Sequence, residues 1–307
     1  MISILIPTYN RSEFLLKNLI ALSVIIKQAG LVDNIEIIVS DNCSIDDTSE
    51  VVTNFAKDHQ LKIKLFKQER NIGLEANALF VLEKGTEQYV MFLGDDDYIS
   101  YDYLVECVRI IKADPDLYVI IPNFVPVSVN DEELGLPRDL IGGTTKYPPG
   151  FKALLINSYR GHQLSGLVLR REGLLDSYQR NKVHNIYLFI YFASAWCLKG
   201  NVYHVSHLPV RVTQPIKKKD WSYGGDGLIN EVFDNYKRLH LNYFQRFAME
   251  IKFMHRSPTR LSMYKAHGVK VWWKALRNIT FAKNATVLFS VFFPLYVALN
   301  RARNVFK

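Results

Sequence analysis

The stretch YVMFLGDDDY, residues 89–98, joins an apolar run to three adjacent aspartates, Asp95, Asp96 and Asp97. The apolar half has the composition of a buried strand. Three neighbouring carboxylates repel one another, and each resists losing water. A buried strand that ends in this way indicates a site where a cation would offset the negative charge.

Further apolar runs precede this one, and helix-like stretches separate them. Strands are predicted at 2–7, 35–41, 63–68 and 89–94, with helices at 12–29, 46–57 and 74–85. This alternation predicts an α/β fold with a doubly wound, mostly parallel sheet. The runs are too continuous for strands with one wet face. Beyond them we expect strands at 118–124, 166–170 and 202–213, a helix at 184–199, and helices from about 228 onward.

Polar residues follow each of the first four predicted strands. They are Pro7–Arg11, Asp41–Asn42, Arg70–Gly73 and Asp95–Asp97. Each group alone could be a turn or a helix cap, but ligands of an open α/β sheet bind at the carboxyl ends of its strands. Carboxylates suit Mg²⁺ or Mn²⁺, which take further ligands from substrate phosphates, so a nucleotide substrate is indicated. There is no Walker P-loop, and no GxGxxG follows the first strand, which disfavours kinases, ATPases and dinucleotide enzymes.

Charge is distributed unevenly along the 307 residues. Residues 251–307 hold eleven Lys and Arg and no Asp or Glu, and since the whole chain carries +8, residues 1–250 carry −3. Such a tail favours an anionic partner. The three cysteines are widely spaced, which argues against a disulfide framework or a zinc site. The N-terminus resembles a strand and not a signal peptide, so we expect no secretion.

The basic tail also has an amphipathic pattern. One helical face carries Val269, Trp272, Trp273, Leu276 and Ile279, and the opposite face carries Lys270, Lys274 and Arg277. The apolar stretch 285–299 is shorter than the roughly 20 residues that span a bilayer. We expect this region to lie on an anionic membrane surface. The alternative is a core helix pair or an oligomer interface; nucleic-acid binding is disfavoured because the aromatic residues cluster with aliphatic ones.

Four motifs in the first 110 residues together resemble glycosyltransferase family 2, which has the GT-A fold. They are ISILIPTYNR, IEIIVSDNCSIDDT, RNIGLEAN and YVMFLGDDDY, in that order. The resemblance implies a GT-A catalytic domain at 1–227, with a nucleotide-sugar-binding half at 1–110 and an acceptor-binding half at 111–227. Residues 228–307 would form a helical, basic, membrane-associating appendage.

The resemblance also implies roles for single residues. The nucleotide sugar would be bound by Pro7, Thr8, Tyr9, Arg11, Asp41, Asn71, Gly73 and Asp95. Asp41 would accept a hydrogen bond from the base. Gly94 stands where the family usually has Asp, which leaves two registers for the metal motif. We favour Asp96 as a metal ligand, and Asp95 would replace the missing Asp beside the metal. Asp97 is assigned as a catalytic residue. In the other register Asp95 and Asp97 form the pair, projecting to one side of an extended chain.

Members of the family generally invert the anomeric centre, which requires a base for the acceptor hydroxyl. His184 is the candidate base, because relatives often carry an acidic residue near this predicted helix start, and Asp176 is a weaker alternative. His162 and His204 are expected to be structural. The loop 214–227, with Lys217–Lys219 and Trp221, is either a flap over the site or a solvated basic loop.

These features together predict a Mn²⁺- or Mg²⁺-dependent glycosyltransferase. It would use a nucleotide-sugar donor and a lipid-linked glycan acceptor at the cytoplasmic face of the plasma membrane. The pathway would be assembly of a surface polysaccharide such as an O-antigen or a capsule, and a homo-oligomer is compatible with the sequence. The alternatives are a nucleotidyltransferase that makes nucleotide sugars and a non-catalytic membrane-attached scaffold, which the glycine at position 94 would suit.

Overall fold

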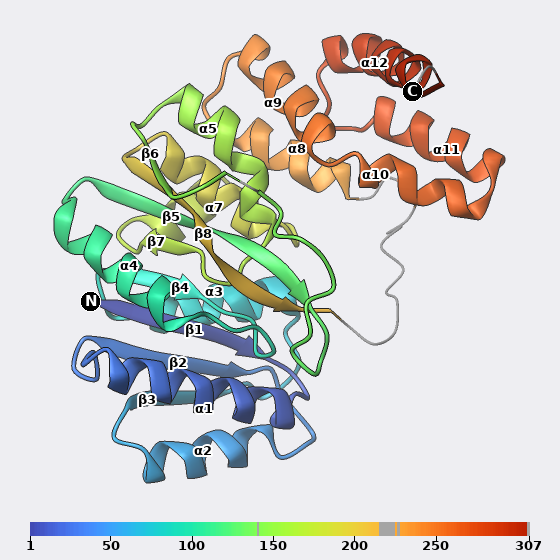
Figure 1. The fold of residues 1–307 in the computed structure, drawn as a ribbon. Helices are drawn as coiled ribbons and strands as arrows, with labels where there is room; N and C mark the ends of the chain where they lie inside the picture. The colour runs from blue at the N-terminus through green and yellow to red at the C-terminus, as the bar shows by residue number, and fades with distance from the viewer. Residues whose placement is uncertain (140, 215–224, 226–227, 306–307) are drawn as a thin grey trace.

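The computed structural model describes residues 1–139, 141–214, 225 and 228–305. Eight strands in this part of the chain form one sheet, in the order β3-β2-β1-β4-β7-β5-β8-β6. Their bounds are Ile2–Thr8 (β1), Ile35–Asp41 (β2), Lys62–Lys67 (β3), Tyr89–Phe92 (β4), Leu117–Val127 (β5), Thr144–Tyr147 (β6), Val168–Arg170 (β7) and Asn201–Thr213 (β8). Helices cover both faces of the sheet, and the C-terminal helices stand beyond one side of it (Figure 1). The predicted α/β fold is confirmed.

The sheet is parallel in its first half and mixed in its second. β1 pairs in parallel with β2 and β4, and β2 pairs in parallel with β3. β7 runs antiparallel to both β4 and β5, while β8 is parallel to β5 and antiparallel to β6. The short β7 therefore joins the nucleotide-binding half that the sequence predicted to a second half with a different strand pattern.

The helices predicted at 12–29, 46–57 and 74–85 begin and end within two residues of the first three helices of the structure, whereas the fourth, Tyr101–Ala113, was not predicted. The α-helices are Ser12–Gln28 (α1), Thr48–Asp58 (α2), Leu74–Lys84 (α3), Tyr101–Ala113 (α4), Phe151–Asn157 (α5), Leu174–Arg180 (α6), Leu188–Cys197 (α7), Ile229–Arg238 (α8), Tyr243–Arg256 (α9), Thr259–Ser262 (α10), Val269–Thr280 (α11) and Val287–Val305 (α12). The short 3₁₀ helices Ser158–His162 (η1) and Met263–His267 (η3) extend α5 and α10. The helix predicted at 184–199 begins four residues later, at Leu188.

Burial follows the sheet position of each strand. Every residue of β2 and β4 is buried, as expected for central strands. β3 alternates between exposed and partly buried residues, because it is an edge strand with a neighbour on one side only. The expectation of uniformly buried strands is wrong for this element.

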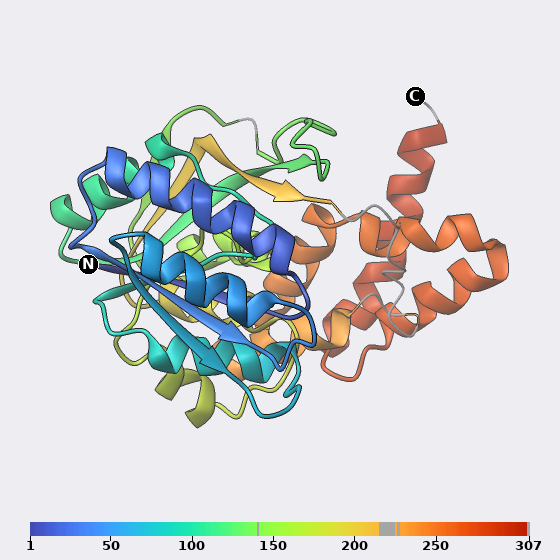
Figure 2. The ribbon, with the colours of Figure 1, turned by 90° about the horizontal axis from the view of Figure 1, so that it is seen from below.

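Two hydrophobic clusters lie on the two faces of the sheet, and consecutive side chains of β1 feed them in turn. Ile4 belongs to the cluster under α1 and α4, whereas Leu5 belongs to the cluster that includes α3 and α7. Figure 2 shows α1 and α2 on their side of the sheet, with the C-terminal helices beyond the side toward which β2 points.

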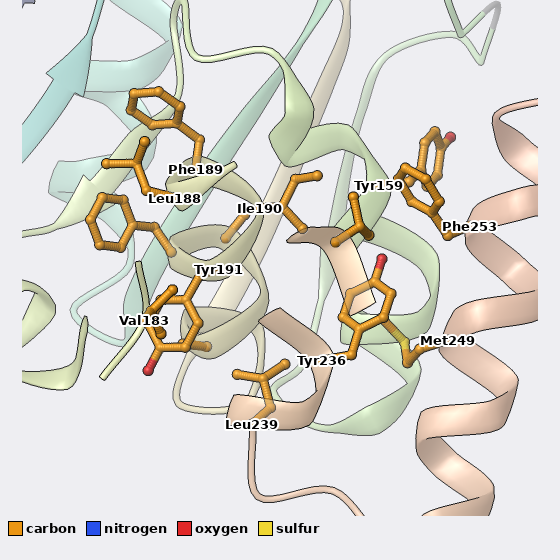
Figure 3. Close-up of a cluster of buried hydrophobic side chains, with 14 of the residues drawn as sticks. Tyr159, Val183, Leu188, Phe189, Ile190, Tyr191, Tyr236, Leu239, Met249 and Phe253 are labelled. Atoms are coloured by element: carbon orange, nitrogen blue, oxygen red, sulfur yellow. The ribbon is translucent and has the colours of Figure 1, made fainter. Parts of the chain in front are cut away.

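The C-terminal helices share the second cluster. Phe253 of α9, Trp272 of α11 and Phe289 of α12 are buried in it together with α7. Figure 3 shows Met249 and Phe253 of α9 directed toward the side chains of α7 and α8. The helices from α8 onward are therefore packed against the sheet domain through a continuous apolar core.

This packing corrects part of the expected membrane face. Trp272, Leu276 and Ile279 were predicted to contact a membrane, but they are at most 8% exposed and lie in the core. Trp273 and Val269, predicted on the same face, are 56% and 73% exposed. The alternative of a core helix pair is therefore correct for α11, because the helix turns its most regular apolar stripe toward the protein.

Two further observations concern the state of the cysteines and the hydropathy of the helices. Cys43, Cys107 and Cys197 are all unpaired, as predicted. In the part of the chain that the structure describes, we find no helix with the length and apolar character needed to cross a bilayer.

Candidate active site

The strand ends meet at one edge of the sheet, where they border a cavity of about 830 Å³. The parallel register sets Thr8 of β1 beside Asp41 of β2, and two residues separate the end of β4 from the Asp95–Asp97 turn. Loops from the second half of the chain and the segment around α10 form the remaining wall. The convergence that the sequence predicted is present in the structure.

The three aspartates lie in a turn and not in an extended strand. β4 ends at Phe92, and the amide of Asp97 donates back to the Gly94 carbonyl at 3.3 Å. The alternation of side chains assumed for an extended chain therefore does not apply here. It was the geometric reason for pairing Asp95 with Asp97, and that reason is wrong.

Each aspartate has a different set of partners. Asp95 accepts a hydrogen bond from the Thr8 hydroxyl at 2.6 Å. Asp96 lies 3.3 Å from the Arg11 guanidinium. Asp97 is 5% exposed and accepts hydrogen bonds from the Thr213 amide at 2.8 Å and from the side chains of Gln163 and Ser165. Asp97 therefore ties the acidic turn to β8 and to the loop before β7.

Burial changes the proton affinity of this turn. Burial raises the pKa of Asp95 to about 6; the Thr8 hydrogen bond opposes this rise and the Asp96 charge adds to it. Burial, together with the Asp96 charge, raises the pKa of Asp97 to about 7. The carboxylates thus meet at an electrostatic cost that a bound cation would lower.

Gly94 is required by the way Asp97 folds back. A Cβ atom at position 94 would lie 2.8 Å from Asp97 Oδ2 and 3.2 Å from Ser165 Oγ. The Gly94 amide also donates to Ser165 Oγ at 2.9 Å. Where the family pattern has an Asp side chain, this chain has Gly94, and the Asp97 carboxylate occupies the space next to the strand end.

The metal ligands named from the sequence fit a divalent ion in number and in type. Asp95 and Asp96 both line the cavity, and magnesium-type sites often use one or two carboxylates and complete their shell with water and substrate phosphate. In the described residues no group of three or more His, Cys, Asp or Glu side chains forms a metal cluster. A metal at this edge would thus depend on the bound substrate for further ligands.

The other predicted nucleotide contacts divide into two groups. Pro7, Thr8, Tyr9, Arg11 and Asn71 line the cavity, whereas Asp41 and Gly73 do not. Asp41 is fully buried, and its oxygens accept hydrogen bonds from the Ser44 amide at 2.9 Å and from the Ser49 hydroxyl. Gly73 has a φ of 85° and donates its amide to Asn71 Oδ1 at 2.9 Å, which shapes the turn before α3.

The sequence analysis placed Asn42 at a strand end but assigned it no role, and the structure shows that it links these elements. Asn42 lines the cavity, donates to Asn71 Oδ1 at 3.0 Å and accepts from the Ile72 amide at 2.8 Å. Its position directly after Asp41 was the available signal, but nothing local shows which of two neighbouring polar residues turns inward. Gln163 and Thr213, which hold Asp97, carried no sequence signal because they come from distant loops.

The histidines do not lie where the catalytic prediction needed them. The side chain of His184 is 80% exposed, its Nδ1 is 3.6 Å from Glu75, and it does not line the cavity. The exposed Asp176 does not line it either. His204 is fully buried 3.5 Å from Asp139, as befits a structural residue. The assignment of His184 as base stays a prediction without geometric support.

His162 does line the cavity, although it was expected to be only structural. Its Nδ1 lies 2.9 Å from the Tyr159 carbonyl and 3.2 Å from Arg138. Burial, helped by the charges of Arg138 and Arg260, lowers its pKa to about 3. The imidazole is therefore neutral at physiological pH and forms an uncharged part of the wall. The predicted flap residues Lys217–Lys219 and Trp221 lie outside the described residues.

Known proteins resemble this chain in sequence and in fold. The sequence model of glycosyl transferase family 2 matches residues 3–166. An abequosyltransferase of Salmonella typhimurium is 30% identical over 119 residues, which are 39% of this chain and 35% of that protein. A GalNAc(5)-diNAcBac-PP-undecaprenol β-1,3-glucosyltransferase of Campylobacter jejuni is 39% identical over 97 residues, 31% of this chain and 29% of that protein. Each match thus spans about a third of the relative.

Solved structures extend the likeness to nearly the whole chain. The Staphylococcus aureus TarS fragment 1–349, in complex with UDP-GlcNAc, has a TM-score of 0.69 at 18% identity and covers 92% of this chain and 81% of that one. A mannosyltransferase of Pyrobaculum calidifontis, in complex with GDP-Man and Mn²⁺, has a TM-score of 0.57 at 14% identity, covering 97% and 79%. At such identities the likeness establishes the fold, which is GT-A. With the family match over more than half of its length, the chain belongs to glycosyltransferase family 2.

Proposed function

We propose that this protein is a metal-dependent, inverting glycosyltransferase. It would move a sugar from a nucleotide donor to a lipid-linked glycan acceptor during assembly of a surface polysaccharide. The observation that carries the proposal is the cavity at the strand ends, where Asp95 and Asp96 lie beside Thr8, Arg11 and Asn71. The family and the fold support the class of reaction.

The donor would occupy the side of the cavity formed by β1, β2 and β4. Tyr9 is 44% exposed there and offers an aromatic ring to a base, and Asn42 and Asn71 offer amides. Asp95 and Asp96 would hold Mg²⁺ or Mn²⁺, which would neutralise the charge that develops on the diphosphate. Because the acceptor oxygen attacks as the diphosphate leaves, a single displacement inverts the anomeric centre.

The proposed lipid-linked acceptor draws support from the relatives and from the C-terminal helices. The Campylobacter relative is named for an undecaprenol diphosphate substrate. α12 exposes a stripe of apolar residues at four-residue spacing, Val287, Val291, Leu295 and Leu299, each at least 57% exposed. With eleven basic residues and no acidic one in 251–307, this stripe suits the surface of an anionic leaflet, on the cytoplasmic side of the membrane.

The donor is tested by a hydrolysis and binding screen. The protein would be incubated with UDP-, GDP-, dTDP- and CDP-sugars, with Mn²⁺, with Mg²⁺ or with EDTA. We expect one nucleotide to bind and its sugar to be released slowly, in both cases only with metal. If every nucleotide bound equally well with metal and with EDTA, the proposed metal site would be wrong. Release of pyrophosphate from a nucleoside triphosphate would instead indicate nucleotidyl transfer.

Membrane attachment is tested by sedimentation with lipid vesicles. We expect binding to vesicles that contain phosphatidylglycerol and much weaker binding to phosphatidylcholine alone. The double change Val291→Glu and Leu295→Glu should abolish it, while Leu136→Glu, at a residue 76% exposed in a distant loop, should not. Equal sedimentation of all variants would show that α12 does not contact the membrane.

A further inference from the structure

The C-terminal region forms part of the wall of the cavity. Arg260 of α10 and Met263 of η3 line the same cavity as Asp95 and Asp96. In Figure 1, α10 lies beyond the side of the sheet toward which β1 and β2 point. The cavity is thus bordered by the acidic turn on the sheet and by a basic residue on the helices.

The core fixes the position of this basic residue. Leu261 and Tyr264 are 8% and 1% exposed and belong to the large hydrophobic cluster. The Arg260 guanidinium lies 5.2 Å from the centre of the Tyr187 ring. Tyr187 is itself held by a hydrogen bond from its amide to Asn185 at 2.9 Å and by one from Asn235 to its carbonyl at 2.9 Å. Arg260 is therefore positioned and not a solvated surface arginine.

Further cations gather around the ring of Tyr159, whose carbonyl contacts His162 of the cavity wall. The Tyr159 ring contacts the guanidinium groups of Arg138, Arg160 and Arg256 at 5.7, 5.4 and 5.5 Å. Asp139 is an ion-pair partner of Arg160, at 2.8 Å, and of Arg138, at 3.7 Å. Among these described side chains, one carboxylate faces several guanidinium groups, so their summed charge is positive.

Arg138 links this charge to the cavity. Its guanidinium stacks 4.8 Å from the centre of the Phe124 ring, and Phe124 lines the cavity together with His162. The Nε and Nη2 atoms of Arg138 are buried and have no hydrogen-bond partner in the described part of the chain. Burial lowers the pKa of His162, and the nearby charges of Arg138 and Arg260 lower it further. This end of the cavity therefore has a positive potential that favours an anion.

We propose that the Arg260–Tyr187 wall of the cavity is a subsite for a phosphate group carried by the acceptor. The inference rests on the proposed glycosyl transfer and names the acceptor chemistry that the site selects. A donor diphosphate would bind its metal at Asp95 and Asp96, on the wall opposite Arg260. Arg260 presents a planar guanidinium that can bind two phosphate oxygens at once. The stacked Tyr187 ring and Met263 would contact the apolar part next to the phosphate.

The subsite is first tested by binding without turnover. The full-length protein would be titrated with farnesyl monophosphate and with farnesol, in EDTA to remove metal from the acidic turn. We expect the phosphate to bind at least about tenfold more tightly than the alcohol, and Arg260→Gln to remove that preference. Arg260→Lys should restore part of it, and Lys265→Gln, an equal charge change on exposed η3, should leave it intact.

A second measurement distinguishes the possible carriers of the phosphate, and it distinguishes an effect on the acceptor from an effect on the donor. Transfer would be compared on one glycan carried by a prenyl diphosphate, by a polyol phosphate and by a neutral alkyl chain, with inorganic phosphate as competitor. Arg260→Gln should raise KM for the phosphorylated acceptors about tenfold and leave the neutral one and the donor KM unchanged. A lower affinity for the donor alone, or a phosphate preference that survives Arg260→Gln, would overturn the inference. A phosphate preference without any transfer would overturn the proposed function and leave the subsite standing.

Discussion

The two walls of the cavity are built in different ways. On the sheet side, Asp95, Asp96 and Asp97 follow a central strand, and Asp97 is held by an amide and two side chains from other elements. On the opposite side, Arg260 sits on a helix of four residues that is fixed by apolar packing of Leu261 and Tyr264. The first wall depends on directional hydrogen bonds, and the second on the docking of a helical region to the core.

This difference has a functional consequence. Hydrogen bonds at the sheet edge hold the carboxylates in a fixed geometry, as the proposed binding of a metal and a donor diphosphate would require. A wall made of helices packed on the core can change its side chains without disturbing the sheet. Recognition of the acceptor would therefore be the part of the site that varies most easily.

The largest effect should come from the metal side of the sheet wall. Asp96→Ala removes a proposed ligand and should lower turnover roughly 1,000-fold or more, since a metal supplies several kcal/mol of transition-state stabilisation. Turnover and thermal melting would be measured together, with Asp58→Ala at the exposed end of α2 as the matched control. Activity within tenfold of the wild type would remove Asp96 from the metal site.

The second-largest effect is expected from moving the Asp97 carboxylate, which hydrogen bonds hold in the sheet wall. Gly94→Ala places a methyl group 2.8 Å from Asp97 Oδ2 and should displace that carboxylate. We expect turnover to fall roughly 10- to 100-fold and stability to fall by about 1 to 3 kcal/mol. Gly142→Ala, at a glycine with nothing within 4 Å of the added atom, is the control. An unchanged Gly94→Ala enzyme would show that the acidic turn tolerates movement.

A smaller effect, on stability alone, compares a buried glutamate from each region. Burial by itself would raise the pKa of Glu36, but hydrogen bonds from Ser3 and Thr86 outweigh it and hold the pKa at about 2. For Glu250, burial raises the pKa, against the hydrogen bonds from Thr286. Glu36 thus stabilises the fold above its unfolded pKa of about 4.5, and this contribution is lost as the pH falls toward 2. Glu250 has the opposite sign: its protonated form favours the fold below its unfolded pKa, and this contribution is lost as the pH rises through its folded pKa.

Urea unfolding at pH 7 and at pH 3 would test this contrast. Glu36→Gln should lose about 2 kcal/mol at pH 7 and much less at pH 3. Glu250→Gln should lose less at pH 7 than Glu36→Gln does. Glu83→Gln, at a side chain that is 58% exposed, should leave the free energy of unfolding unchanged at both pH values. The same pH dependence in both buried variants would contradict the contrast between the regions.

The smallest effect is expected at His184. Because its side chain is 80% exposed and does not line the cavity, His184→Ala should change kcat by no more than about twofold. The pH dependence of kcat would be measured as well. A loss of roughly 100-fold, together with a shifted pH profile, would restore His184 as the base and would mean that the C-terminal wall closes over it during turnover.

Much of the sheet wall could be predicted from the sequence, because local patterns carry it. The continuous apolar run 35–41 coincides with β2, and the Pro-Thr-Tyr-Asn turn lies where the motif put it. The inward turn of Asn42 and the anchoring of Asp97 could not be predicted, since they depend on contacts with Asn71 and with Thr213, far along the chain. The face of α11 was misjudged for a related reason: an apolar stripe that could lie on a membrane equally well packs against a core.

The sequence by itself determined the family, the strand–helix alternation and the acidic edge, because periodicity and motifs act over a few residues. Only the tertiary structure decided that Gly94 makes room for Asp97, that β7 runs antiparallel between β4 and β5, and that Arg260 reaches the same cavity as Asp96. The physical reason is sequence distance. Arg260 and Asp96 are joined only through the apolar packing of the C-terminal helices on the sheet domain, and no local pattern encodes that contact.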